Sequence, residues 1–115
     1  MALRILLVED EAMIALHMED LVADLGHEVT ASAMKLAEAV TLARQCDVDF
    51  AILDVNLAGE MSFPVADELT QRGVPYVFAT GYGSAGIAPP YNQQTIMHKP
   101  VGLTSLRRAI GAVAA

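Results

Sequence analysis

The sequence predicts an α/β domain in which helices cover both faces of a doubly wound, five-stranded parallel sheet. Five short, largely apolar runs carry this prediction, at 3–8, 27–33, 50–54, 74–80 and 96–99 of the 115 residues. Continuous apolar runs of this length are typical of strands that are buried on both faces. Helical patterns or loops separate the runs, and that alternation is typical of a parallel sheet with helices on both sides.

Apolar side chains recur at helical spacing in four segments between and after these strands. Glycine favours the position after a helix and serine the position before one. The first helix should therefore end at Gly26, and the third should run from Ser62 to Gly73. Pro64 fits the first turn of that third helix. The apolar positions of the four segments are Ile14, Met18, Leu21, Val22 and Leu25, then Leu36, Val40 and Ala43, then Val65, Ala66 and Leu69, and last Leu106, Ala109, Ile110 and Val113.

Composition bounds the class of protein. Apolar residues make up 54% of the chain and charged residues 18%, which is typical of one globular domain, here expected to span residues 1–115. The net charge of −7 argues against nucleic acid as a partner, because no cluster of Lys or Arg is present to neutralise phosphates. Cys46 is the only cysteine, and no apolar run is long enough for a signal peptide or a membrane span. The expected location is the cytoplasm, away from membranes.

Polar side chains stand where four of the predicted strands end. They are Glu9 and Asp10 after the first strand, Asp54 at the end of the third, Thr80 at the end of the fourth and Lys99 at the end of the fifth. In doubly wound sheets the carboxyl ends of the strands form the ligand site, so these side chains should lie close together.

The chemistry of this set indicates phosphoryl transfer. Three carboxylates packed together repel one another, and a divalent cation removes that cost. Oxygen ligands without nitrogen or sulfur suit Mg²⁺. With the ammonium of Lys99 and the hydroxyl of Thr80, the cation would complete a pocket for a phosphoryl group. Asp54 would then be the nucleophile that becomes an acyl phosphate.

Each of these residues also has a plainer interpretation. An acid such as Glu9 or Asp10 is often a helix cap when it follows a strand. Thr80 alone is a common strand residue, and Lys99 alone is a common surface residue. Their joint placement at strand ends favours one shared site over separate structural roles.

The motifs around these residues resemble the receiver domains of bacterial two-component response regulators, over essentially the whole chain. The matching stretches are LLVEDE with Glu9 and Asp10, ILDVNL with Asp54, FAT with Thr80, and KP with Lys99. More narrowly, Phe-Ala-Thr-Gly-Tyr at 78–82 resembles a subfamily of receivers that often stand alone. The resemblance implies the flavodoxin-like topology of receiver domains.

The resemblance also implies a role for each residue. Asp54 would accept a phosphoryl group from a sensor histidine kinase or a histidine phosphotransfer protein, and the chain would then signal to an unknown downstream protein by direct contact. Lys99 would contact the phosphoryl oxygens, and the Lys99–Pro100 bond would be cis. Thr80 would swing toward the phosphate as the switch. The ligands of Mg²⁺ would be Glu9, acting mainly through a bound water, with Asp10, Asp54 and the backbone carbonyl of Asn56. Such a protein is not an enzyme beyond its own phosphorylation and dephosphorylation.

The sequence departs from the usual receiver pattern at several positions. Ala58 and Ser62 stand where proline and glycine are common after the phosphoacceptor, which leaves the shape of that loop open. Ile96 stands where receivers often carry an aromatic residue coupled to the switch threonine. One hypothesis is that Tyr82, two residues after Thr80, replaces that aromatic side chain; the alternative is that Tyr82 only packs within its loop.

Residues 81–95 should not form an ordinary fourth helix. Three glycines and two prolines fall in this stretch, and both residue types oppose helix formation. We expect a short, displaced or mobile helix there. Because this helix belongs to the output face of ordinary receivers, the contacts with the downstream partner should differ as well.

Other functions fit the same residues less well. A phosphohydrolase of the haloacid dehalogenase type needs a second Asp two residues after the nucleophile, where this chain has Asn56. A flavodoxin-like nucleotide or flavin binder needs a phosphate loop after the first strand, where EDEAM would repel phosphate. A degenerate receiver, used only for protein contact, would not need the complete set of acids, threonine and lysine. A receiver excised from a hybrid histidine kinase remains an alternative to a stand-alone regulator.

Overall fold

The computed structural model describes residues 2–81 and 87–114, and it confirms the predicted parallel sheet. The strand order is β2-β1-β3-β6-β7, and every neighbouring pair in this sheet is parallel. The first strand lies inside the sheet, so the chain moves to one edge and then crosses to build the other side. The strands are β1 (Arg4–Val8), β2 (Glu28–Ala33), β3 (Phe50–Asp54), β6 (Tyr76–Thr80) and β7 (Ile96–His98).

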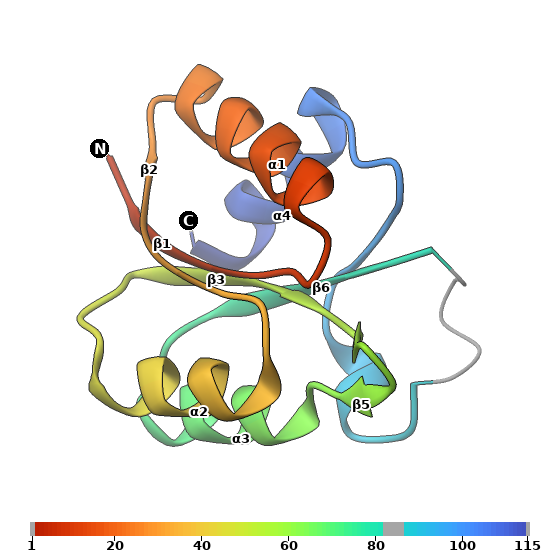
Figure 1. Cartoon of the computed structure of the whole chain (residues 1–115). Helices are drawn as coiled ribbons and strands as arrows, with labels where there is room; N and C mark the ends of the chain where they lie inside the picture. Colours follow the sequence, from red (N-terminus) through yellow and green to blue (C-terminus); the bar gives the residue numbers. More distant parts are fainter. Residues whose placement is uncertain (1, 82–86, 115) are drawn as a thin grey trace.

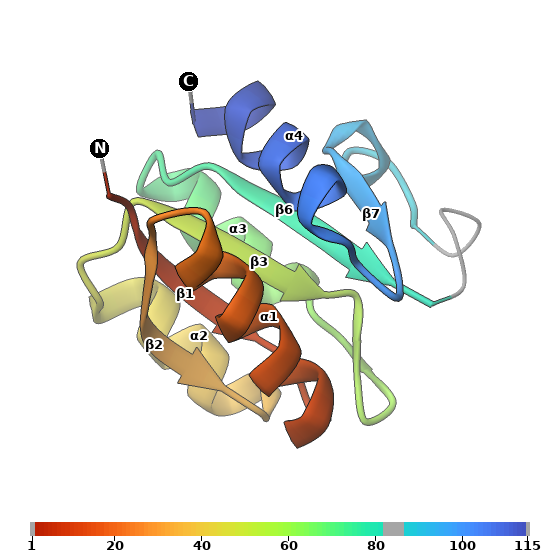
Figure 2. The ribbon, with the colours of Figure 1, turned by 90° about the horizontal axis from the view of Figure 1, so that it is seen from above.

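In the described residues, four α-helices cover the two faces of the sheet, which Figure 1 shows edge-on and Figure 2 from above. Helices α1 (Ala12–Asp24) and α4 (Leu103–Ala114) lie on one face. Helices α2 (Leu36–Gln45) and α3 (Phe63–Gln71) lie on the other. No helix in the described residues has the length and apolar character needed to cross a membrane.

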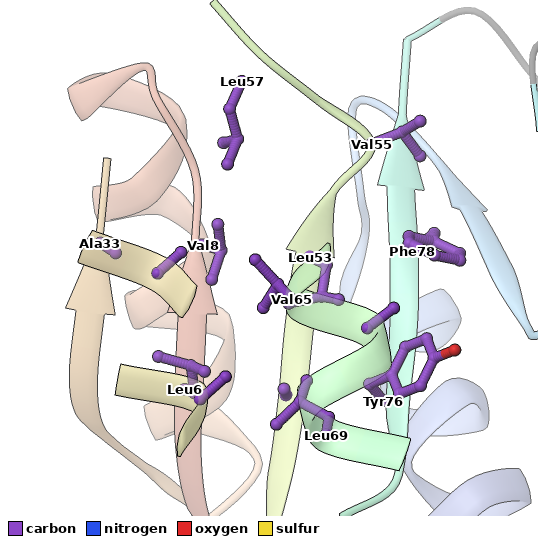
Figure 3. Close-up of a cluster of buried hydrophobic side chains, with 14 of the residues drawn as sticks. Leu6, Val8, Ala33, Leu53, Val55, Leu57, Val65, Leu69, Tyr76 and Phe78 are labelled. Atoms are coloured by element: carbon purple, nitrogen blue, oxygen red, sulfur yellow. The ribbon is translucent and has the colours of Figure 1, made fainter. Parts of the chain in front are cut away.

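The apolar strands divide the core into two clusters, one under each pair of helices. Along β3, Phe50 and Ile52 pack toward α1 and α4, whereas Ala51 and Leu53 pack toward α2 and α3. Figure 3 shows the second cluster, in which Leu53 lies close to Val65 of α3. This alternation explains why the run contains no polar residue before Asp54, since both faces of β3 are buried.

The predicted helix boundaries are confirmed at both glycines. Gly26 and Gly73 follow α1 and α3 with φ of 85° and 71°, a conformation that glycine adopts without steric cost. Ser62 precedes α3 as expected, but its hydroxyl makes no cap and is buried without a hydrogen-bond partner. Its backbone carbonyl begins the helix instead, accepting from Val65 N at 2.9 Å.

A small β-hairpin follows β3 and was not predicted. Strands β4 (Asn56–Leu57) and β5 (Glu60–Met61) pair antiparallel across a two-residue turn at Ala58 and Gly59. Val55 and Leu57 anchor it in the core, where Figure 3 shows both side chains. The open question about the loop after Asp54 is thus answered by a compact hairpin at the carboxyl end of β3.

The described part of the segment between β6 and β7, residues 81 and 87–95, departs from a regular helix, as predicted. Within its described residues, only a 3₁₀ turn forms, η1 (Tyr91–Gln93). Tyr91 stacks on Phe63 with ring centroids 4.3 Å apart, and its hydroxyl donates to Asp67 of α3 at 2.7 Å. These contacts fasten η1 against α3. Tyr82, the hypothesised replacement for the missing aromatic side chain, lies outside the described residues.

Candidate functional site

The parallel sheet brings the predicted polar residues to one edge. Glu9 and Asp10 follow β1, Asp54 ends β3 and Thr80 ends β6. Lys99 follows β7, and its N–H donates to the carbonyl of Thr80 at 2.9 Å, which extends the pairing of β6 and β7 by one residue. The placement of every one of these side chains therefore depends on strand register.

Three carboxylates meet at this edge. One ligand oxygen from each of Glu9, Asp10 and Asp54 lies within 4.8 Å of the others. Glu9 is 3% exposed and Asp54 is 7% exposed, whereas Asp10 is half-buried. Burial of several carboxylates at such separations is unfavourable unless cations or hydrogen bonds compensate their charge.

Lys99 supplies part of that compensation. Its Nζ lies 2.6 Å from Glu9 Oε1 and 3.2 Å from Asp54 Oδ2, and its side chain is 17% exposed. The second carboxylate oxygen of Glu9 accepts the N–H of Glu11 at 3.1 Å, at the start of α1. Lys99 is therefore not a solvated surface lysine, and Glu9 joins the helix start to the acid cluster.

The pKa of Asp54 is raised to about 7. Burial is the main cause, because it disfavours the charged carboxylate, and the negative charge of Glu9 adds to it. The charge of Lys99 and its hydrogen bond act in the opposite direction but do not outweigh these causes. Without a bound cation, Asp54 thus keeps its proton to a higher pH than an ordinary aspartate does.

The pKa of Asp10 is shifted in the opposite direction, below its ordinary value. Burial acts to raise its pKa, but hydrogen bonds with Asp54 and Glu9 and from backbone amides hold the pKa below its ordinary value. One of these donors is the N–H of Ala58, 3.1 Å from Asp10 Oδ2. Asp10 therefore stays ionised beside a less acidic Asp54.

A cavity of about 640 Å³ opens over the acids. Asp10, Asp54, Asn56, Thr80 and Lys99 line it, together with apolar side chains at its rim. Thr80 itself is buried at 4% exposure. The amide oxygen of Asn56 accepts the N–H of Gly59 at 2.7 Å, so the side chain of Asn56 belongs to the hairpin. The structure thus brings together the six predicted site residues, Glu9, Asp10, Asp54, Asn56, Thr80 and Lys99.

The donor set fits a hard divalent cation. All three clustered side chains offer oxygen, and none offers nitrogen or sulfur. Lys99 neutralises only part of three negative charges, so a bound cation would relieve the remaining repulsion. Mg²⁺, which takes a few carboxylates and keeps waters, is the ion that this site suits best.

Two features of the site were missed from the sequence. The first is the main-chain contact between Ala58 and Asp10, since a backbone donor leaves no mark in residue types. The second is an apolar cavity of about 420 Å³ between α1 and the loop after β7, with Asp54 and Lys99 among its lining residues. Exposed Met13 and Leu16 lie on the same helix, at 78% and 57% exposure. Their helical spacing is visible in the sequence, but their exposure is not.

Fold and site together define the class of protein. Residues 5–111 match the response regulator receiver domain family, and the chain belongs to that family. The predicted two-component response regulator class is thereby confirmed.

Similar proteins agree with this assignment. The chain is 41% identical over 85 residues to the phyllosphere-induced regulator PhyR of Methylorubrum extorquens, a match that covers 71% of this chain and 32% of PhyR. It is 27% identical over 111 residues to the transcriptional regulatory protein PdtaR of Mycobacterium tuberculosis, covering 93% of this chain and 54% of PdtaR. The chain thus spans about a third to a half of the curated relatives it matches.

Solved structures extend the likeness to the whole fold. The solution structure of SdrG from Sphingomonas melonis superposes with a TM-score of 0.87 at 35% identity, covering 96% of this chain and 95% of SdrG. PhyR from Brucella abortus superposes with a TM-score of 0.86 at 27% identity, covering 99% of this chain and 48% of PhyR.

Proposed function

We propose that this protein is a phosphoacceptor in a two-component phosphorelay, with Asp54 as the residue that carries the phosphoryl group. One observation supports this more than any other. The Asp54 carboxylate ends a fully buried strand, next to Lys99 and two further acids, and opens on a cavity large enough for a phosphoryl group. A carboxylate serving only as a cap would not need these neighbours.

The transfer is a displacement at phosphorus. A carboxylate oxygen of Asp54 attacks the phosphorus atom of a phosphohistidine, forming an O–P bond while the N–P bond breaks. The electron pair of that broken bond stays on the imidazole nitrogen. Hydrolysis reverses the state of Asp54: water attacks phosphorus, the O–P bond to Asp54 breaks, and inorganic phosphate leaves with the protons of the water.

The surrounding residues prepare Asp54 for this chemistry. Glu9, Asp10 and Asp54, with the backbone carbonyl of Asn56, would hold Mg²⁺, which supplies positive charge opposite the phosphoryl oxygens when bound. Lys99 contributes a second positive charge, 3.2 Å from Asp54 Oδ2. Thr80 lies at the neighbouring strand end on the same cavity, where its hydroxyl would sense the phosphorylated state.

The phosphohydrolase alternative finds less support. The general acid of that class would stand at Asn56, which has no acidic proton and whose amide oxygen accepts from Gly59. The further roles proposed here follow the receiver family. They are an unidentified protein as downstream partner, signalling by direct contact, and a cytoplasmic location.

Incubation with Mg²⁺ and phosphoramidate is expected to add one phosphoryl group to the protein, as seen by intact mass. Asp54→Asn should abolish the adduct, because the attacking carboxylate is gone. Asp24→Asn, which changes an exposed acid at the end of α1, is the matched control and should leave the adduct unchanged. No adduct on the parent protein, or an equal adduct on Asp54→Asn, would contradict the proposal.

We propose a histidine-containing protein as the phosphodonor, and an apolar surface beside the site supports the docking of a protein there. The apolar cavity beside α1 reaches Asp54 and Lys99, and Met13 lies both on its wall and largely in solvent. Leu16 extends this surface along the same helix. Large apolar side chains exposed beside a cavity are typical of protein-binding surfaces. A sensor kinase or a phosphotransfer protein is therefore the expected donor.

Met13→Ser combined with Leu16→Ser is expected to slow phosphotransfer from a histidine-phosphorylated donor protein by about tenfold or more, since each side chain buries apolar area on docking. Transfer from phosphoramidate should stay within about twofold, because that small donor does not touch α1. Met34→Ser, an exposed methionine outside both cavities, is the control. Equal slowing with both donors would show that the substitutions damage the site and would refute docking at this surface.

A further inference from the structure

The hairpin of β4 and β5, between β3 and α3, is held firmly in place. Its base is closed by Ser62 N donating to Val55 O at 2.8 Å, and Leu57 is 2% exposed beneath it. Its two strands pair at Leu57–Glu60 and at Asn56–Met61. The turn between them is therefore held from both sides, and Figure 1 shows β5 of the hairpin beyond the carboxyl end of β3.

The turn itself has an unusual residue in it. Ala58 has φ of 52° and Gly59 has φ of 94°, the pattern of a hairpin turn in which both central residues are left-handed. Asn, Asp and Gly favour the first of these positions, whereas an alanine side chain is disfavoured there. Ala58 is the one non-glycine residue of the described chain with positive φ. Such a conformation persists only where surrounding contacts enforce it.

The left-handed conformation has a consequence at the acid cluster. It is accompanied by a hydrogen bond from the N–H of Ala58 to Oδ2 of Asp10, 48 residues away in sequence, at 3.1 Å. A proline at this position, as is common in receivers, has no N–H to give. The other main-chain donor of the turn, Gly59 N, is directed to Asn56 Oδ1 at 2.7 Å and not to the acids.

We propose that the main-chain N–H of Ala58 is a positioning group for the cation site, which holds the Asp10 carboxylate in place for Mg²⁺. An N–H bound to one carboxylate oxygen leaves the second oxygen available to a cation and fixes the plane of the carboxylate. Groups that orient a metal ligand in this way contribute to affinity without touching the ion. The inference rests on the proposed function only in taking the acid cluster as the Mg²⁺ site.

Replacing a single amide by an ester tests this directly. L-Lactic acid incorporated at position 58 by nonsense suppression keeps the methyl group and the chain path but removes the N–H. The ester is expected to weaken Mg²⁺ binding by about tenfold, measured by titration of the unphosphorylated protein. Glycolic acid at position 59 is the matched control, since it removes the other turn donor, and its Mg²⁺ affinity should stay within about twofold.

Ala58→Gly provides a second variant that avoids ester chemistry. It keeps the N–H and removes the methyl group that disfavours the left-handed backbone, so we expect a higher urea midpoint than that of the parent. An ester at position 58 that binds Mg²⁺ within twofold of the parent would overturn the inference, as would equal weakening by both esters. No saturable Mg²⁺ binding by the parent would overturn the cation site itself. Phosphorylation of the parent by phosphoramidate is measured separately and distinguishes the two failures.

Discussion

Asp54→Asn is expected to make the Mg²⁺-free protein more stable, by about 1–3 kcal/mol at about pH 8. At that pH the native state must hold an ionised Asp54 in a buried site beside Glu9, whereas an asparagine carries no charge. The substitution also removes the ion pair between Asp54 and Lys99, which offsets part of this gain. The offset is only partial because Lys99 keeps its ion pair with Glu9. Proteins often sacrifice stability in this way at sites that must react.

The pH dependence gives this prediction its sign. A carboxyl group whose native pKa lies at about 7 keeps its proton in the native state after the unfolded chain has lost it. The parent protein should therefore lose stability as pH rises from about 4 to about 7, while Asp54→Asn should lack this loss. The lowered pKa of Asp10 affects stability only below the ordinary pKa of an aspartate, which lies outside this pH window.

Urea denaturation in EDTA at several pH values measures the effect. The difference in the free energy of unfolding between Asp54→Asn and the parent should be near zero at about pH 4 and largest above about pH 7. Asp24→Asn at the exposed end of α1 should show no such trend. A constant difference across the range would mean that repulsion and burial do not act on Asp54 as described.

Lys99→Met is expected to have the largest destabilising effect, about 2–4 kcal/mol at about pH 8 without Mg²⁺. Lys99 pairs with two buried carboxylates, and removing it leaves both without their cation. Methionine preserves the length of the side chain, so the loss reports charge more than packing. Lys35→Met, at an exposed lysine before α2, should stay within about 0.5 kcal/mol of the parent.

The double variant Asp54→Asn/Lys99→Met separates the ion pair of Lys99 with Asp54 from its ion pair with Glu9. When Asp54 is already asparagine, Lys99 has only Glu9 left to compensate, so Lys99→Met should cost less than in the parent. A coupling energy of about 1 kcal/mol or more is expected from the cycle of urea denaturations. Additive effects of the two substitutions would show that Lys99 and Asp54 do not interact in solution.

Much of the fold could be predicted because the strands are buried on both faces. The run FAIL has no polar residue, since Phe50 and Ile52 face one cluster while Ala51 and Leu53 face the other. The two glycines after α1 and α3 were equally informative, because few residues other than glycine adopt the positive φ found at these positions. Where backbone conformation and burial restrict residue type, sequence is a sufficient guide.

The hairpin could not be predicted for the opposite reason. Its strands have two residues each, and its turn places alanine where asparagine or glycine is usual. Ser62 shows a related limit, because the serine marks the helix start while its buried hydroxyl makes no cap. In both cases tertiary contacts, and not local preference, set the conformation.

The candidate site, too, could be predicted only in part from the sequence. Strand order and strand ends were enough to bring Asp54 and Lys99 together, since parallel strands place their last residues at one edge. The direct pairing of Lys99 with Glu9, at 2.6 Å, needed the side-chain geometry. The contact from Ala58 to Asp10 required the hairpin, which the sequence did not reveal.

The central claim is that Asp54 itself carries the phosphoryl group, and mapping the modified residue tests it most directly. Phosphoramidate-treated protein is reduced with borohydride, which converts an aspartyl phosphate to homoserine, and is then digested and sequenced by mass spectrometry. We expect homoserine at position 54 and at no other aspartate, and only when Mg²⁺ is present. Homoserine at Asp10 or at another aspartate, or none anywhere in a protein that has gained the mass of a phosphoryl group, would contradict it.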